Sequence, residues 1–123
     1  MKNYFQDLLN ATESTQSLKK IFFTNEYSKK NPLLKIKATI YGRVQGVGFR
    51  YTTVILAEQL KVNGIVKNLP DGSVYVEACA DQKSIEKFLR GLANGPSPAA
   101  EVEKVEVTYD NAIPDYSSFK TVY

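Results

Sequence analysis

Residues 35–50 read Lys-Ile-Lys-Ala-Thr-Ile-Tyr-Gly-Arg-Val-Gln-Gly-Val-Gly-Phe-Arg, and they join a strand pattern directly to a glycine-rich loop. Apolar Ile36, Ala38 and Ile40 alternate with polar side chains, which is the two-residue period of a half-buried strand. The glycines that follow mark a backbone that turns tightly and approaches something closely. Arg50 stands where this loop meets a helical pattern, and helix N-termini attract anions. The stretch therefore predicts a strand, a loop suited to holding phosphate, and a helix.

Periodicity and turn residues predict the elements that follow this loop. Helical patterns cover residues 51–62 and 85–92, and strands are expected near 65–66, over 73–78, over 105–109 and over 119–122. The buried face of the first helix is expected to consist of Val54, Ala57 and Leu60. The second helix is expected to be capped by Asp81 or Ser84. This order predicts an α+β, ferredoxin-like βαββαβ sandwich, with an antiparallel sheet and two helices on one face.

The segment before this pattern differs in character, and we expect two parts: an N-terminal extension over residues 1–34 and a domain over residues 35–123. The extension is expected to be partly helical or disordered, and to dock on the domain through its aromatic side chains. Two short helical faces are expected in it, formed by Phe5, Leu8 and Leu9 and by Leu18, Ile21 and Phe22. No secretion or transit signal is expected there, because an apolar core with a cleavage site is missing and acidic residues are present.

The amino-acid composition of the chain argues against several classes of function. The formal charge of +3 suits attraction of a small anion and falls short of the basic footprint of a nucleic-acid binder. Cys79 is the single cysteine, which indicates a reducing cytoplasm and a thiol that fills space. No stretch is apolar enough to cross a bilayer, so no membrane partner is expected. Without histidine, Ser-His-Asp and Cys-His mechanisms are excluded, and no metal site or cofactor is expected.

Three known kinds of phosphate-binding loop each require a residue that this loop lacks. A nucleotide P-loop needs Lys-Ser or Lys-Thr after its last glycine, where this chain has Phe49 and Arg50. The dinucleotide fingerprint needs a small residue where Tyr51 stands, and a tyrosine-phosphatase loop needs a cysteine where Val44 stands. The remaining possibility is a loop that binds phosphate through its backbone N–H groups and one guanidinium, that of Arg50.

The chain resembles the acylphosphatase family. The family signature Gly-(Arg/Lys)-Val-Gln-Gly-Val-x-(Phe/Tyr)-Arg is matched throughout residues 42–50, and residues 64–74 carry a second signature that contains Asn68. The resemblance covers residues 35–123. It departs from the family pattern at Ile65, where an aromatic residue is common, and at Ala80, where glycine is usual.

The resemblance implies a metal-independent hydrolase that cleaves acyl phosphates to a carboxylate and inorganic phosphate. Arg50 then binds the substrate phosphate, and Asn68 positions the attacking water. The backbone N–H groups expected to surround the phosphoryl oxygens belong to Gly46, Val47, Gly48, Phe49 and Arg50. The expected partners are a small acyl phosphate and inorganic phosphate as an inhibiting product, with the protein acting as a monomer.

Two other function classes compete with this hypothesis. An RNA-recognition domain shares the order of elements, but it needs an aromatic motif on its third strand, where this chain offers only Tyr75 beside Glu77. An anion-binding domain without turnover is the other alternative. Gln45 either braces the loop or meets the ligand, and Tyr51 packs near the loop without a catalytic role.

Overall fold

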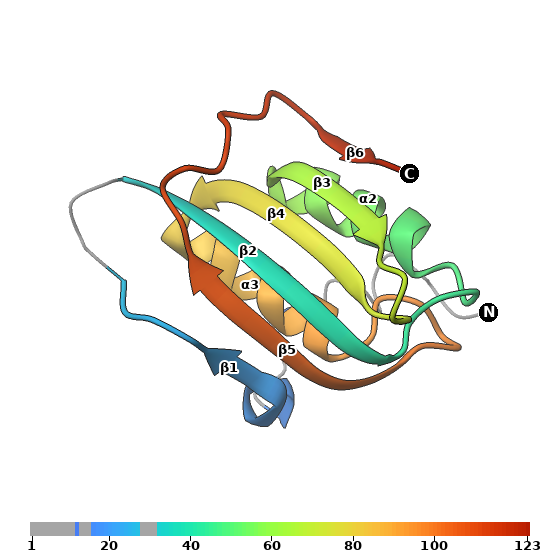
Figure 1. Ribbon diagram of the computed structural model, residues 1–123. Coiled ribbons are helices and arrows are strands. Elements are labelled where there is room, and N and C mark those ends of the chain that lie inside the picture. The colour runs from blue at the N-terminus through green and yellow to red at the C-terminus, as the bar shows by residue number, and fades with distance from the viewer. Residues whose placement is uncertain (1–11, 13–15, 28–31) are drawn as a thin grey trace.

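The computed structural model describes residue 12, residues 16–27 and residues 32–123. Within these residues, one six-stranded sheet packs against two α-helices (Figure 1). In chain order the elements are the 3₁₀ helix η1 (Gln16–Lys20), β1 (Ile21–Phe23), β2 (Leu33–Arg43), α2 (Phe49–Leu60), β3 (Asn63–Asn68), β4 (Val74–Asp81), α3 (Gln82–Ala93), β5 (Glu101–Tyr109) and β6 (Phe119–Thr121). The predicted βαββαβ order is confirmed by β2 to β5 and the helices between them.

The sheet is mixed, with the predicted antiparallel pairing at its centre and a parallel strand at each edge. Its strand order is β1-β5-β2-β4-β3-β6. The four central strands pair antiparallel as predicted, but β1 pairs parallel with β5, and β6 pairs parallel with β3. Both additions are three-residue edge strands. Side-chain alternation carries no information about strand direction, so the sequence pattern could not reveal their parallel pairing.

The segment before residue 35 contributes to the sheet. Ile21 and Phe22, expected on a helix, belong to strand β1, and η1 ends just before them. The ring of Phe23 stacks on that of Tyr109 with 5.5 Å between centroids, so aromatic docking does occur. The expected helical face of Phe5, Leu8 and Leu9 lies outside the described residues. Strand β2 begins at Leu33, and the division of the chain at residue 35 stays a prediction.

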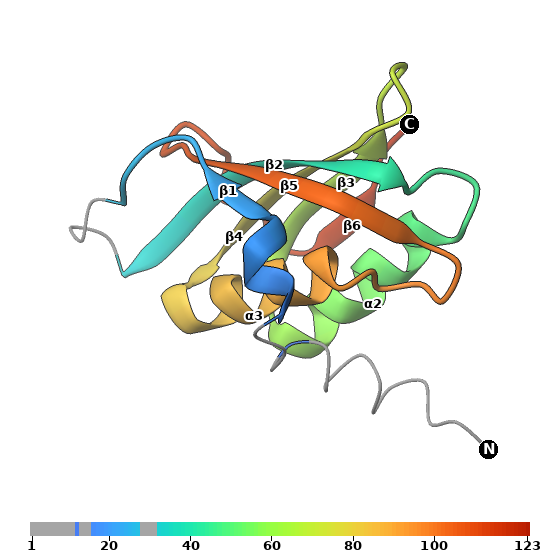
Figure 2. The same ribbon diagram turned by 90° about the horizontal axis from the view of Figure 1, so that it is seen from below.

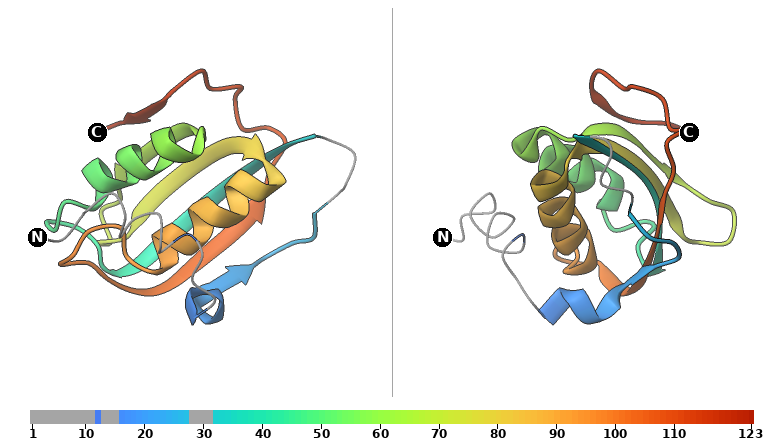
Figure 3. Two further views of the ribbon diagram at one scale, coloured as in Figure 1. Left: turned by 180° about the vertical axis from the view of Figure 1, so that it is seen from behind. Right: turned by 90° about the vertical axis from the view of Figure 1, so that its left-hand side faces the viewer.

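Both helices cover one face of the sheet, as Figure 2 shows from below. The predicted alternation in β2 is confirmed, because Ile36, Ala38 and Ile40 are buried under the helices. The helices lie side by side (Figure 3) and approach closely, since a Cβ added at Gly91 of α3 would lie 2.6 Å from Leu56 of α2. No helix of the described residues has the length and apolar character needed to cross a membrane.

The buried face of α2 differs from the prediction. Ala57 is buried as expected, whereas Val54 and Leu60 are only half-buried. The helix begins at Phe49, two residues earlier than the predicted start, and its core face runs from Phe49 through Thr53 to Ala57. These residues are spaced by four positions and lie along one stripe of the helix. Val54 and Leu60 pack at the margin of the core, and Val54 also lines the pocket described below.

Helix α3 follows its prediction closely. The Asp81 side chain caps it by accepting a hydrogen bond of 2.8 Å from the backbone N–H of Ser84. This bond to the backbone N–H lowers the pKa of the Asp81 carboxyl, because it favours the charged form. Of the two predicted caps, Asp81 is therefore the one used. The apolar stripe that the sequence predicts after this cap is buried, and Ile85 and Phe88 belong to it.

Candidate active site

Two glycines give the loop between β2 and α2 its shape. Gly46 and Gly48 have φ of 75° and 78°, in the left-handed region that side chains rarely adopt, and Gly48 is the N-cap of α2. A Cβ added at either glycine would meet nothing within 4 Å. The glycines are therefore needed for backbone conformation rather than for packing, and the space beside them is open.

The backbone N–H groups along this loop are free to bind an anion. Within the described part of the chain, none of the amides of residues 46–50 donates a hydrogen bond. The first helical bond of α2 runs from the N–H of Thr52 to the carbonyl of Gly48, at 3.1 Å. The Thr52 hydroxyl donates to the same carbonyl at 3.0 Å and stabilises this turn. Successive unpaired amides at a helix N-terminus form a concave anion site.

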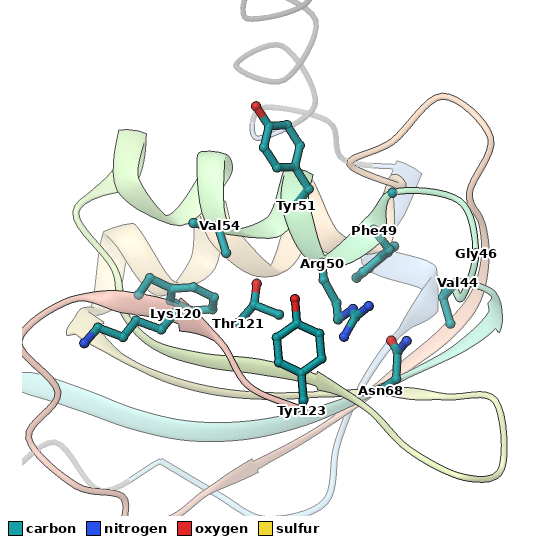
Figure 4. A pocket seen from close by; sticks show the side chains of 12 residues that line it. Val44, Gly46, Phe49, Arg50, Tyr51, Val54, Asn68, Lys120, Thr121 and Tyr123 are labelled. Carbon is teal, nitrogen blue, oxygen red and sulfur yellow. The ribbon is translucent and has the colours of Figure 1, made fainter.

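Arg50 projects from the first turn of α2 into the space beside the loop (Figure 4). Its guanidinium carbon lies 4.9 Å from the centroid of the Tyr123 ring. Among the described residues, no carboxylate forms an ion pair with Arg50. A guanidinium that stacks on an aromatic ring and lacks a carboxylate partner keeps its fork of donors available for a phosphate group.

Asn68 is the last residue of β3, and its amide lies beside the Arg50 guanidinium in Figure 4. Its Oδ1 atom is buried and has no hydrogen-bond partner among the residues that the structure describes. A buried acceptor without a partner costs about 1–3 kcal/mol, so such atoms are uncommon in folded proteins. An orphaned acceptor beside an unpaired cation indicates a position for a water molecule or a ligand.

Gln45 ties the loop to the turn that follows Asn68. Its Nε2 donates to the carbonyl of Leu69 at 2.7 Å and to that of Ser73 at 2.8 Å. The structure thus decides between the two predicted roles, because the side-chain amide braces the backbone of the β3–β4 turn. The brace holds the loop and Asn68 in a fixed relation, although β2 and β3 are not neighbours in the sheet.

Replacing Gln45 with leucine is expected to remove both bonds and to lower kcat for an acyl phosphate about tenfold, since small misplacements of a positioned group slow reaction steeply. Each carbonyl keeps a backbone donor, since the N–H of Gly72 also bonds to Leu69 and the N–H of Leu69 also bonds to Ser73. A hydrogen bond contributes about 0.5–1.5 kcal/mol, so the loss of two is expected to lower the free energy of unfolding by about 1–3 kcal/mol. Steady-state kinetics and urea denaturation measure the two effects. Gln59→Leu on the exposed side of α2 is the matched control. Lower stability with undiminished kcat in the Gln45 variant would show that the brace does not position the site.

A pocket of about 570 Å³ brings the predicted site residues together. It is lined by Val44, Gly46, Gly48, Phe49, Arg50, Tyr51, Val54, Asn68, Phe119, Lys120, Thr121 and Tyr123. Val47 is absent from this lining and packs against the core, and its assignment to phosphate binding stays a prediction. Sequence reasoning missed the C-terminal wall from Phe119 to Tyr123, because only the parallel pairing of β6 with β3 brings it to the loop.

Other conspicuous residues lie away from this pocket. Ile65 lies within β3 and Ala80 within β4, and neither departure from the family pattern reaches the pocket lining. Cys79 is buried, and burial raises the pKa of its thiol. In the described ranges, no group of three His, Cys, Asp or Glu side chains is arranged to hold a metal ion.

Comparison with known proteins agrees with this geometry. The acylphosphatase family model matches residues 36–121. An acylphosphatase of Enterococcus faecalis is 41% identical over 88 residues, which cover 72% of this chain and 97% of that protein. One of Archaeoglobus fulgidus is 43% identical over 91 residues, covering 74% of this chain and 100% of that protein. The crystal structure of acylphosphatase from Bacillus subtilis superposes with a TM-score of 0.70 and 36% identity, covering 73% of this chain and 99% of that chain. The chain therefore belongs to the acylphosphatase family.

Proposed function

We propose that this chain hydrolyses the carboxyl-phosphate bond of acyl phosphates by direct attack of water, with the phosphoryl group held by the loop and Arg50 and the water oriented by Asn68. Family membership supports the hydrolase activity. The observation that supports these two roles concerns the described residues: among them the buried Oδ1 of Asn68 has no hydrogen-bond partner, and Arg50 beside it forms no ion pair.

Hydrolysis of an acyl phosphate needs little assistance from acidic or basic side chains. The leaving group is a carboxylate, which is stable as an anion, so it departs without a proton. The remaining demand is to position the phosphoryl group and to stabilise charge on its equatorial oxygens during in-line displacement. The amides of Gly46, Val47, Gly48 and Phe49, with that of Arg50, supply fixed dipoles, and the guanidinium supplies a permanent charge.

Asn68 acts on the water. Its amide oxygen accepts a hydrogen bond from the water, which directs a lone pair of the water oxygen toward phosphorus. The oxygen–phosphorus bond forms as the bond from phosphorus to the acyl oxygen breaks, and the proton of the water passes to a phosphoryl oxygen. No metal or cofactor takes part in this proposal.

The proposal extends to partners and location. Inorganic phosphate, the product, fits the same cradle and inhibits competitively. We propose that the monomer is active, because the loop, Arg50 and Asn68 of one chain together supply the groups that the proposed reaction uses. A single free and buried cysteine suits a cytoplasmic setting.

The open face of the sheet disfavours the RNA-binding alternative. The hydroxyls of Tyr75 and Tyr116 both donate to the Glu77 carboxylate, at 2.7 Å and 2.5 Å. Burial and the bond to Glu77 raise the pKa of Tyr116 to about 12, and they raise the pKa of Tyr75 as well. Both phenols therefore stay neutral at physiological pH and keep their hydrogen bonds to Glu77. A carboxylate at the centre of this face would repel an RNA backbone.

The test is hydrolysis of benzoyl phosphate by the full chain with and without EDTA. We expect saturable turnover that EDTA leaves unchanged and that inorganic phosphate inhibits competitively. Binding of phosphate without turnover would support the anion-binding alternative instead. Turnover that EDTA abolishes would contradict a metal-independent mechanism.

A further inference from the structure

The pocket is larger than a phosphoryl group and one water require. Its volume of about 570 Å³ lies in the range of sites that bind whole small molecules. The loop, Arg50 and Asn68 account for one end of it. The other end carries the apolar side chains of Val54 and Phe119 together with Lys120 and Thr121, and these residues so far have no assigned role.

This second end lies on the side of Arg50 away from Asn68. Strand β6 runs parallel to β3 with Thr121 opposite Val66, two residues before Asn68 along the strand. On α2, Val54 follows Arg50 by about one helical turn. Figure 4 agrees, because Val54 and Thr121 lie on one side of the Arg50 guanidinium and Asn68 lies on the other. In-line displacement places the leaving group opposite the attacking water, so the acyl group belongs at this end.

The Thr121 hydroxyl is available at this position. Thr121 is half-buried, and its side chain forms no hydrogen bond with any residue that the structure describes. Figure 4 shows the hydroxyl pointing into the space between Val54 and Arg50. Pairing of β6 with β3 holds its backbone in place. Tyr123, by contrast, is fully exposed, so its hydroxyl is less well fixed.

We propose that this end of the pocket is the acyl subsite, and that the Thr121 hydroxyl donates a hydrogen bond to the carbonyl oxygen of the substrate. The inference rests on the proposed function and specifies its substrate class, namely acyl phosphates with an aromatic or short aliphatic acyl group seated against Val54 and Phe119. When the bond from phosphorus to the acyl oxygen breaks, its electron pair stays with the acyl group, and the charge spreads over both carboxylate oxygens. The bond from Thr121 therefore strengthens as the leaving group departs, which accelerates the chemical step.

The test compares Thr121→Val and Thr121→Ser with wild type on benzoyl phosphate and acetyl phosphate. We expect Thr121→Val to lower kcat about tenfold on both substrates, the scale of one hydrogen bond to a developing charge. Thr121→Ser is expected to restore kcat to within about twofold, since it keeps the hydroxyl. Thr39→Val is the matched control, because Thr39 lies on the opposite face of the sheet outside the pocket lining.

Two further readouts separate a hydrogen bond to the leaving group from a structural effect. The inhibition constant of inorganic phosphate is expected to stay unchanged in Thr121→Val, because phosphate has no acyl group. Across substituted benzoyl phosphates, the loss is expected to grow as the leaving benzoate becomes more basic. Unchanged kcat in Thr121→Val, a weakened phosphate inhibition, or the same loss for every benzoate would each overturn the proposal.

Substrate preference tests the apolar wall, and wild-type turnover separates the two proposals. We expect wild type to have a lower KM for benzoyl phosphate than for acetyl phosphate, because the phenyl group removes more apolar surface from water. Equal KM values would contradict the seat formed by Val54 and Phe119. Absence of turnover on both substrates would instead overturn the proposed function itself.

Discussion

Replacing Arg50 with alanine is expected to lower kcat/KM for benzoyl phosphate by about 10³-fold, within the range measured when a cation or donor that stabilises transition-state charge is removed. The guanidinium has no carboxylate partner among the described residues, so its donors remain for the phosphoryl oxygens. Competitive inhibition by inorganic phosphate is expected to disappear together with turnover. Initial rates over a range of phosphate concentrations measure both effects.

Two further variants isolate the role of Arg50. Arg50→Lys keeps the charge but loses the planar fork, so its activity is expected to lie between wild type and Arg50→Ala. Arg43→Ala removes an exposed arginine near the same loop and is expected to keep wild-type rates, which controls for loss of charge alone. Phosphate inhibition that survives in a folded Arg50→Ala variant would contradict phosphate binding by this side chain.

Replacing Asn68 with alanine is expected to lower kcat by about 10²–10³-fold, the usual loss for one preorganised group that acts in the transition state. The inhibition constant of phosphate is expected to change little, because Asn68 acts on the water. The free energy of unfolding is expected to stay the same or to rise, since the change removes a buried acceptor that has no partner within the described part of the chain. Kinetics and urea denaturation on one preparation give all three quantities.

Asn63→Ala is the matched control for Asn68. Asn63 begins the same strand and lies outside the pocket lining, so its replacement is expected to leave kcat unchanged. Full kcat in a folded Asn68→Ala variant would contradict its role in orienting water. A large loss of phosphate affinity would instead assign Asn68 to phosphate binding.

The sequence predicted the central fold well because its signals are local. Alternation over β2 and β4, helical spacing over α3 and the capping position of Asp81 each depend on residues within one element or its end. Arg50 and Asn68 are predicted site residues because both lie in signature segments, and both line one pocket in the structure.

The remaining features depend on tertiary contacts that leave no local signal. Gln45 donates to backbone carbonyls, which every residue carries, so its partners cannot be read from side-chain types. Thr121 reaches the site only through the parallel pairing of β6 with β3. Helix α2 begins at Phe49, after Gly48 in the left-handed conformation and two residues before the predicted start, so Phe49 joins its buried face.

Water held by Asn68 is expected to attack the phosphorus atom of a substrate held by the loop and Arg50. Hydrolysis of benzoyl phosphate in ¹⁸O-labelled water, with mass spectrometry of both products, measures where the water oxygen goes. We expect the label to appear in inorganic phosphate and benzoate to carry none. Label in benzoate would show attack at the carbonyl carbon and would contradict this mechanism.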